Sequence, residues 1–342
     1  MNSRLDSQKP ASRGDPGPVL QAAGLHTYFE IGGAVFPAVR GVDFTLERGR
    51  TLGLVGESGC GKTVTALSLM GLVPPPGRIV SGSIRLRDRE GSPRELTTLP
   101  EKKLRRIRGR EMGMIFQEPM TSLNPVFTVG EQIREAILVH EPVGRRAARE
   151  RALGLLEDVN IPDPAGRWGD YPHQLSGGQR QRVMIAIALA CNPGVLIADE
   201  PTTALDVTVQ ARILELISRL RDRHRMAVLL VTHDLGVVAQ ATERVAVMYL
   251  GRIVESAETR RLFANPGHHY TRALLDSVPR LGEEKRRLRT VRGSVPALSR
   301  IPSGCSFHPR CPRAEEICRR ESPQPREVGP GHRVECHFPL NQ

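Results

Sequence analysis

The sequence predicts an α/β fold, and three apolar runs carry that prediction. Residues 51–55 form a short apolar run, which precedes the glycine-rich stretch 56–63 and a helix-like run at 64–70. Residues 195–199 form a second apolar run that ends in Asp199, and residues 226–231 form a third that leads to Thr232-His233-Asp234. Polar groups at the carboxyl ends of parallel strands face the crevice where α/β proteins bind ligands.

The glycine-rich stretch is GESGCGKT, which fits the phosphate-binding pattern G-x-x-x-x-G-K-[ST]. Its glycines let backbone N–H groups turn inward around phosphate oxygens, and the following helix points its positive end at them. We expect Lys62 to reach the β- and γ-phosphates and Thr63 to offer its hydroxyl to Mg²⁺. The other residues predicted to line the nucleotide are Gly56, Glu57, Ser58, Gly59, Cys60 and Gly61. A glycine turn between core elements is the alternative.

Cys60 stands beside Lys62 at the start of a helix, where the pKa of a thiol tends to fall. One interpretation is a redox-sensitive thiol whose modification blocks ATP binding. The favoured one is that Cys60 fills a position that requires a small residue.

Composition describes a soluble globular chain. The 342 residues have room for roughly two domains, and no apolar run approaches the ~18 residues of a membrane span. Residues 1–18 are polar, so we expect a disordered start, no signal peptide and a cytosolic location. The net charge of +12 permits contact with nucleic acid or an anionic membrane. The basic runs 102–108 and 285–289 contain no interleaved aromatic residues, which favours solvated helix faces.

The residues on either side of the phosphate-binding loop predict further strands and helices. Residues 19–46 predict short antiparallel strands with turns at Gly32-Gly33 and Gly41. A helix should end at Gly71, an edge strand should cover 83–87, and a basic helix should cover 101–108. Residues 113–116 predict a buried strand that ends at Gln117, and the helical spacing at 128–190 predicts an inserted helical subdomain. Trp168 in that insertion is expected to pack.

The stretch Leu175-Ser176-Gly177-Gly178-Gln179 precedes a helix. Ser176 and Gln179 fit the capping box S-x-x-Q, which starts helices. Two glycines in a first helical turn are poor helix formers, but they leave bare N–H groups open to an anion. We expect an anion-binding helix start rather than a flexible cap.

Two carboxylates and a histidine complete the predicted site. Asp199, at a strand end, should hold Mg²⁺ through water. Glu200 follows directly and is placed to orient or deprotonate an attacking water. His233, at the end of a neighbouring strand, should contact the γ-phosphate.

These motifs occur in the order found in ATP-binding-cassette ATPases, which residues 19–263 resemble. The resemblance implies a P-loop NTPase fold with a RecA-like core, an antiparallel β subdomain and a helical signature subdomain. It implies a head-to-tail dimer in which Ser176, Gly177, Gly178 and Gln179 meet the γ-phosphate bound by the partner and Asp206 crosses the interface. Glu200 would be the general base and His233 the γ-phosphate sensor. Gln117 would contact Mg²⁺ and water and link to the membrane partner. Phe29 would stack on the base, with Tyr28 the alternate.

The C-terminal part is similar to oligopeptide and dipeptide importer ATPases. The similarity rests on 265-NPGHHYTRALL-275, where His269 replaces the usual Pro, and on 116-FQEPMTSLNP-125. It implies a peripheral subunit at the cytoplasmic face of the membrane that works with two permeases, a paralogous ATPase and an external binding protein. Nickel importers share the pattern. We therefore expect a disordered segment 1–18, a cassette at 19–264 and a C-terminal extension at 265–342.

Four cysteines in the extension, Cys305, Cys311, Cys318 and Cys336, lack the tight pairs of structural zinc sites. Iron–sulfur clusters accept more varied spacing, and similar importer tails resemble four-iron cluster sites. We therefore expect a [4Fe–4S] cluster that staples a tail too poor in apolar residues to fold alone. Zinc with His308, His332 or His337 is the first alternative, and unligated thiols are the second.

Two rival functions remain. A soluble cassette ATPase that acts on DNA or ribosomes would suit the positive charge, but the chain lacks the coiled-coil insertion or tandem cassette common there. A regulatory module with an inactive cassette conflicts with intact Lys62, Asp199, Glu200 and His233. We expect no nucleic-acid partner.

Overall fold

The computed structural model describes residues 17–117, 122–203, 205–278 and 291–340. Most of the predicted disordered start, part of the 116–125 motif and the basic run 285–289 therefore lie outside the described residues. Within those ranges, no helix has both the length and the apolar character needed to cross a bilayer.

The predicted α/β fold is confirmed, and its centre is an eight-stranded sheet of order β11-β12-β10-β9-β3-β8-β7-β6. Strands β6 to β9 together with β3 are parallel neighbours, and almost all their residues are buried because helices or a second sheet cover both faces. Their bounds are β6 Met112–Ile115, β7 Val195–Asp199, β8 Ala227–Thr232, β3 Thr51–Val55 and β9 Arg244–Tyr249.

The sheet continues beyond β9 with antiparallel strands. The antiparallel strand β10 (Arg252–Glu258) follows it, and the hairpin of β12 (His332–Val334) and β11 (Arg326–Gly329) pairs with β10. The hairpin strands are only three and four residues long, so they carry too little periodicity to be recognised. The C-terminal residues thus form part of the central sheet.

A second, antiparallel sheet has the order β2-β1-β4-β5, with bounds β2 Ala34–Leu46, β1 Leu20–Ile31, β4 Gly77–Arg87 and β5 Pro93–Glu95. The predicted turn at Gly32-Gly33 is confirmed, with φ values of 59° and 79° that favour glycine. The predicted turn at Gly41 is wrong. Gly41 is an extra residue inside β2, because Val42 pairs with Leu25 and Arg40 pairs with His26. The predicted edge strand at 83–87 belongs to β4, which β1 and β5 flank.

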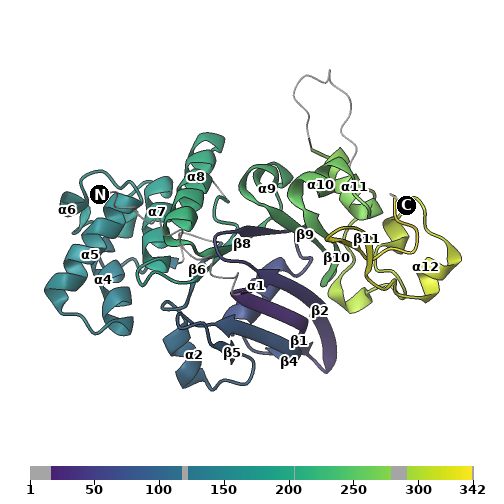
Figure 1. Ribbon diagram of the computed structural model, residues 1–342, viewed down its shortest axis with the longest axis horizontal. Helices are drawn as coiled ribbons and strands as arrows, with labels where there is room; N and C mark the ends of the chain where they lie inside the picture. The colour runs from purple at the N-terminus through teal and green to yellow at the C-terminus, as the bar shows by residue number, and fades with distance from the viewer. Residues whose placement is uncertain (1–16, 118–121, 204, 279–290, 341–342) are drawn as a thin grey trace, which may run out of the picture.

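Helix α1 (Lys62–Met70) links the two sheets. It begins directly after the glycine-rich loop and ends at Gly71 in a left-handed conformation, as expected. The buried hydroxyls of Thr27 in β1 and Ser68 in α1 lie 2.7 Å apart. In Figure 1, α1 lies beside the antiparallel sheet and below β9 and β8. The start of α1 is therefore held between two rigid layers.

The helical insertion stands at the opposite end from the C-terminal extension (Figure 1). Its elements are α4 Val129–His140, α5 Arg145–Asp158, α6 Pro164–Arg167, η1 Pro172–Gln174 and α7 Gly177–Ala188. Trp168 packs as expected, because a Cβ on Gly130 would lie 2.2 Å from its ring. The remaining helices of the cassette are α2 Glu101–Ile107, α8 Val207–His224, α9 Leu235–Ala241 and α10 Thr259–Ala264.

The C-terminal extension contains α11 His269–Asp276, η2 Leu298–Arg300, η3 His308–Arg310, α12 Glu316–Arg320 and the β11–β12 hairpin. Its core is Phe307, which is 2% exposed. The Phe307 ring lies 5.3 Å from the rings of both Tyr249 in β9 and Tyr270 in α11. The end of β9 thus supplies apolar surface that the extension lacks by itself.

Candidate active site

Close backbone contacts explain the glycines of the loop between β3 and α1. A Cβ on Gly56 would lie 2.2 Å from the carbonyl oxygen of Met248, and one on Gly61 would lie 2.3 Å from that of Ala38. Gly61 also has a φ of 104°, which L side chains rarely adopt. The loop is therefore pressed against the end of β9 and against β2, and its shape depends on these two glycines.

Lys62 closes the loop on itself. Its Nζ donates hydrogen bonds to the carbonyl oxygens of Gly56, at 2.8 Å, and Glu57, at 3.1 Å, and the residue is 5% exposed. An ammonium group whose partners carry no negative charge is a natural ligand for phosphate oxygens. The loop thus holds Lys62 at its inner surface.

Cys60 is completely buried beneath the loop. Burial raises the pKa of its thiol, and this effect outweighs the attraction of the Lys62 ammonium. The expectation of a lowered pKa is therefore wrong. A Cβ on Gly56 would lie 2.8 Å from the Cys60 sulfur, which agrees with a small residue filling a tight space.

Thr63 and Asp199 meet across the ends of α1 and β7. The Thr63 hydroxyl donates to a carboxylate oxygen of Asp199 at 3.3 Å. Burial is the main reason why the pKa of Asp199 rises to about 6, and the Glu200 charge adds to it, while Thr63 and Lys62 oppose the rise. A hydroxyl and a carboxylate are hard oxygen ligands, and Mg²⁺ in nucleotide sites takes one or two carboxylates together with waters and phosphates. These donors fit that ion.

Glu200 is the centre of a polar cluster. Its carboxylate accepts hydrogen bonds from the Gln117 amide at 3.1 Å and the Thr203 hydroxyl at 2.8 Å, and it lies 3.1 Å from Nδ1 of His233. Burial raises the pKa of Glu200, but the bonds from His233 and Thr203 outweigh it and leave the pKa below its ordinary value. The backbone of Glu200 has a φ of 46°, a left-handed conformation that is unusual for a non-glycine residue. The carboxylate is thus ionised and held by three neighbours.

The cluster and the loop face one cavity of about 680 Å³. Its lining includes Gly56, Glu57, Ser58, Gln117, Glu200 and His233. The structure therefore brings together the loop and the three residues predicted to be catalytic. The part that each plays in a reaction stays a prediction.

Other predicted site residues lie outside the lining of this cavity. Ser176 and Gln179 form the predicted capping box, with bonds of 2.9 and 3.3 Å, at the start of α7 with Gly177 and Gly178. Asp206 caps α8 by accepting the Val209 N–H at 2.9 Å. Phe29 lies in β1 against Gly77, where a Cβ would be 2.6 Å from its ring. The sequence analysis predicted that these residues contact a nucleotide. None of them lines this cavity of their own chain.

The C-terminal extension supplies a wall of the cavity that sequence reasoning did not assign to the site. Leu274, Ser294 and Val295 line it. Tyr270, which adjoins Leu274 in α11, contacts the loop residue Glu57. The only sequence signal was the 265–275 segment, which indicated a family but no contact.

The predicted iron–sulfur cluster is wrong. Among the described residues, which include Cys305, Cys311, Cys318 and Cys336, no group of three or more His, Cys, Asp and Glu is placed to hold a metal ion. Burial raises the pKa of Cys305 and of Cys336 to about 11, so these thiols are protonated in the metal-free protein. Phe307, packed against Tyr249 at the end of β9, gives the extension an apolar core that the sequence analysis did not anticipate.

The zinc alternative fails in the same way, because no such group of ligands among the described residues includes His308, His332 or His337. Each of these histidines has a partner in the protein. His308 lies 3.0 Å from the carbonyl oxygen of Cys305, and His337 lies 2.9 Å from that of Glu321. His332 pairs with the buried carboxylate of Glu255 at 2.7 Å.

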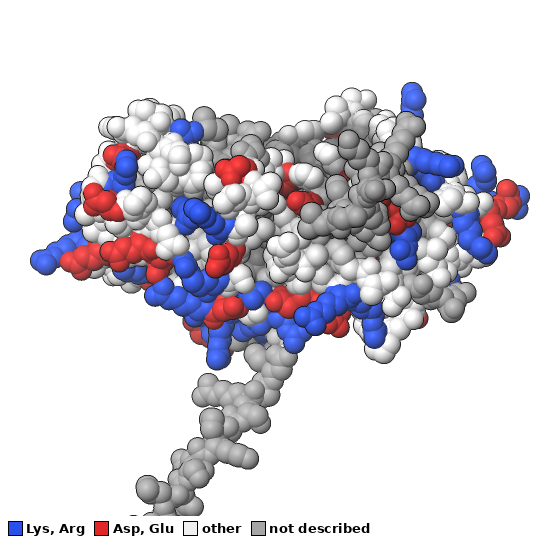
Figure 2. All heavy atoms as spheres, turned by 90° about the horizontal axis from the view of Figure 1, so that it is seen from above, with Lys and Arg blue, Asp and Glu red and all other residues white. Residues whose placement is uncertain are grey.

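Charge on the surface is mixed. On the face seen in Figure 2, Lys and Arg side chains alternate with Asp and Glu instead of forming one continuous basic stripe. Ion pairs also occur around α2, where Arg105 and the C-cap residue Arg108 both pair with Glu101.

Comparisons with known proteins agree with this geometry. The family model "ABC transporter" matches residues 39–203, and the model "Oligopeptide/dipeptide transporter, C-terminal region" matches residues 254–318. A putative peptide import ATP-binding protein of Brucella melitensis is 52% identical, with 93% of this chain and 96% of that protein covered. The dipeptide transport ATP-binding protein DppD of Escherichia coli is 46% identical, with 94% and 97% covered.

A solved structure extends the comparison to the fold. The dimeric ATP-binding cassette MJ0796 bound to ADP and phosphate superposes with a TM-score of 0.62 at 26% identity. The match covers 70% of this chain and 99% of that one. The remainder of this chain has no counterpart in that cassette.

Proposed function

The chain belongs to the ATP-binding-cassette transporter ATPases, in the group that carries the oligopeptide/dipeptide transporter C-terminal region, and on this premise we propose that it drives peptide import. It is an ATPase of that family. The observation that carries the proposal is the ionised Glu200 carboxylate, held by Gln117, Thr203 and His233 at the cavity that the phosphate-binding loop lines.

In the proposed mechanism the chain positions ATP and activates water. Lys62 keeps its hydrogen bonds to the carbonyl oxygens of Gly56 and Glu57 and donates its remaining N–H to the phosphates of ATP. Glu200 accepts a proton from the attacking water, while Gln117 and His233 orient that water and the γ-phosphate. Thr63, Asp199 and Gln117 would hold Mg²⁺, which neutralises charge on the phosphates.

We further propose that the site is completed by a second cassette. Ser176, Gly177 and Gly178 begin α7 with N–H groups outside their own chain's cavity, and Asp206 lies at the start of the neighbouring helix α8. A partner's nucleotide could be bound there, through the N-terminal end of a helix. The partner is a paralogous ATPase in this proposal. The isolated subunit should then hydrolyse ATP slowly, and rapid turnover by dilute monomer would contradict this arrangement.

An apolar cavity supports a membrane partner. It has a volume of about 420 Å³ and lies between α2, β6, α4 and α7, with Phe116, Val139 and Ile187 in its lining. Phe116 is 41% and Val139 is 69% exposed, and Gln117 follows Phe116 directly. We propose that a permease segment docks here at the cytoplasmic face of the membrane, so that its movement reaches Gln117. An external binding protein would supply the peptide, and nickel or another small solute is the second candidate cargo.

The experiment is purification of the tagged chain from membranes of its source organism, with mass spectrometry of what accompanies it. We expect two multi-span permeases and a second ATPase. Val139→Asp should release the permeases and leave basal ATP hydrolysis intact, whereas Ile31→Asp, at a 55% exposed apolar site on the β1–β2 hairpin, should release nothing. Recovery with ribosomes or DNA and without permeases would overturn the proposal and favour the rival reading.

A further inference from the structure

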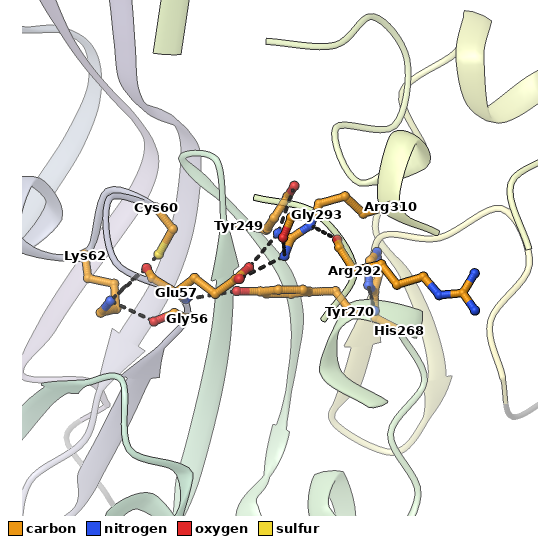
Figure 3. A network of polar contacts seen from close by, with 10 residues as sticks. All are labelled: Gly56, Glu57, Cys60, Lys62, Tyr249, His268, Tyr270, Arg292, Gly293 and Arg310. Carbon is orange, nitrogen blue, oxygen red and sulfur yellow. Dashed lines mark hydrogen bonds and ion pairs between the residues drawn. The ribbon is translucent and has the colours of Figure 1, made fainter. Parts of the chain in front are cut away.

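Arg310 connects the C-terminal extension to the phosphate-binding loop. Its guanidinium donates two hydrogen bonds to the Glu57 carboxylate, at 2.6 and 2.9 Å. Two more go to backbone carbonyl oxygens of Arg292, at 2.8 Å, and Gly293, at 3.3 Å. The Arg310 side chain is only 4% exposed. Figure 3 shows the guanidinium between Glu57 and the 292–293 segment, so it fastens that segment and the loop to the same point.

Tyr270 holds the same loop residue from α11. Its hydroxyl accepts the backbone N–H of Glu57 at 2.9 Å (Figure 3). The ring is fully buried and lies 4.7 Å from the Tyr249 ring. Because burial raises the pKa of Tyr270, the hydroxyl stays protonated. The extension therefore forms hydrogen bonds with both the side chain and the backbone of Glu57.

The third contact of Glu57 is with Lys62, which is proposed to bind the phosphates. Its carbonyl oxygen accepts a hydrogen bond from Lys62 Nζ at 3.1 Å. One residue thus meets Arg310 through its carboxylate, Tyr270 through its N–H and the phosphate-binding lysine through its carbonyl. A shift of Glu57 would move the carbonyl that helps to place Lys62.

We propose that Arg310 is a positioning residue for ATP binding, which acts through Glu57, with Tyr270 as its second anchor. The C-terminal extension then sets the geometry of the phosphate-binding loop, in addition to any role in transport. Charge-assisted bidentate pairs fix orientation as well as distance, which suits this task. A substitution that weakens the binding of substrate and transition state equally raises KM and leaves kcat unchanged, so a small release of the loop should appear in KM and Kd.

The chain offers a matched control for this ion pair. Arg252 in β10 makes two hydrogen bonds, at 2.9 and 3.1 Å, to Glu335 in the extension. This pair also joins the extension to the main sheet, but neither residue lines the phosphate-loop cavity. If Arg310 only fastens the extension, loss of either pair should have the same effect on ATP.

The test is steady-state ATP hydrolysis and fluorescent ATP-analogue binding by the full chain, as purified in its complex. For Arg310→Met we expect KM and the analogue's Kd to rise at least tenfold, with kcat within about threefold of wild type. Arg310→Lys, which keeps the charge but loses the paired geometry, should recover part of the affinity. Arg252→Met should leave KM within about twofold of wild type. Equal KM increases in Arg310→Met and Arg252→Met would overturn the proposal.

A double-mutant cycle tests whether the effect passes through Glu57. Glu57→Gln combined with Arg310→Met should raise KM no further than the worse single variant, because both substitutions break the same ion pair. Independent, multiplying increases would overturn the proposal. If Arg310→Met fails to fold, Tyr270→Phe removes only one hydroxyl, keeps the packed ring and should raise KM about three- to fivefold. An unchanged KM in that variant would likewise overturn it. Wild-type hydrolysis in the same assay separates this outcome from failure of the proposed function.

Discussion

The two walls of the nucleotide cavity are built in opposite ways. The cassette wall carries Gln117, Glu200 and His233, and the His233 side chain is 61% exposed. The extension wall rests on Tyr270 and Arg310, whose side chains are buried. Groups that meet a substrate and water must be accessible, whereas groups that hold a loop gain strength from exclusion of water. The comparison separates the residues proposed to act on ATP from the residues proposed to position the phosphate-binding loop.

The largest expected effect comes from removal of the proposed general base in the cassette wall. Glu200→Gln should lower kcat about 1,000-fold, because the amide cannot accept the proton of the attacking water, and ATP affinity should change less than about threefold. Single-turnover and equilibrium ATP-binding measurements test this. Glu215→Gln, the same substitution on the exposed side of α8, is the control. Wild-type turnover in Glu200→Gln would mean that another group is the base.

The next effect is on the extension wall and concerns stability. Phe307→Ala should lower the free energy of unfolding by about 3 kcal/mol, because it leaves a cavity between Tyr249 and Tyr270. Urea titration of the full chain measures it. Phe338→Ala, at a half-buried position of the same extension, should cost about 1 kcal/mol. Equal losses would show that Phe307 is not the centre of the extension's packing.

A smaller effect depends on pH and also belongs to the extension wall. Burial lowers the pKa of His268 from 6.5 to about 4, with Glu255 opposing and His269 assisting the decrease. The folded state therefore favours neutral His268. Its stability contribution is complete above pH 6.5 and is lost as the pH falls towards 4, by about 2 kcal/mol between pH 7 and 5.

His268→Asn keeps an acceptor for the Tyr270 N–H, which His268 caps at 3.0 Å, but cannot titrate. Urea unfolding at pH 7 and pH 5 should show a loss about 2 kcal/mol smaller than in wild type. The same loss in both proteins would assign the pH dependence to other groups.

The smallest effect tests the loop between the two walls. Cys60 is completely buried, whereas Cys305, Cys311 and Cys336 are partly exposed, so maleimide should reach these three first. Cys60→Ser should change ATP affinity by less than about twofold. Rapid alkylation of Cys60 with loss of ATP binding would show that the loop opens far more than its packing indicates.

The same contrast explains what the sequence could predict. Asp199, Glu200 and His233 each follow the apolar run of a buried strand, so local pattern and strand topology placed them at one sheet edge. Arg310 is the last residue of η3, which is too short to show periodicity, and it lies 253 residues after Glu57, so only the folded chain brings the two together. The cysteine spacing gave a wrong prediction of an iron–sulfur cluster because spacing carries no information about burial. The apolar core of the extension lies instead around Phe307.

The distance along the chain between Glu57 and Arg310 also sets an order of events during protein synthesis. The phosphate-binding loop leaves the ribosome early, and the arginine that anchors it follows 253 residues later. At roughly 5–20 residues per second, that interval lasts on the order of 10–50 seconds. A nascent or prematurely ended chain would therefore carry a complete phosphate-loop motif without its anchor. Under the positioning role proposed for Arg310, such a fragment should bind ATP more weakly than the complete chain.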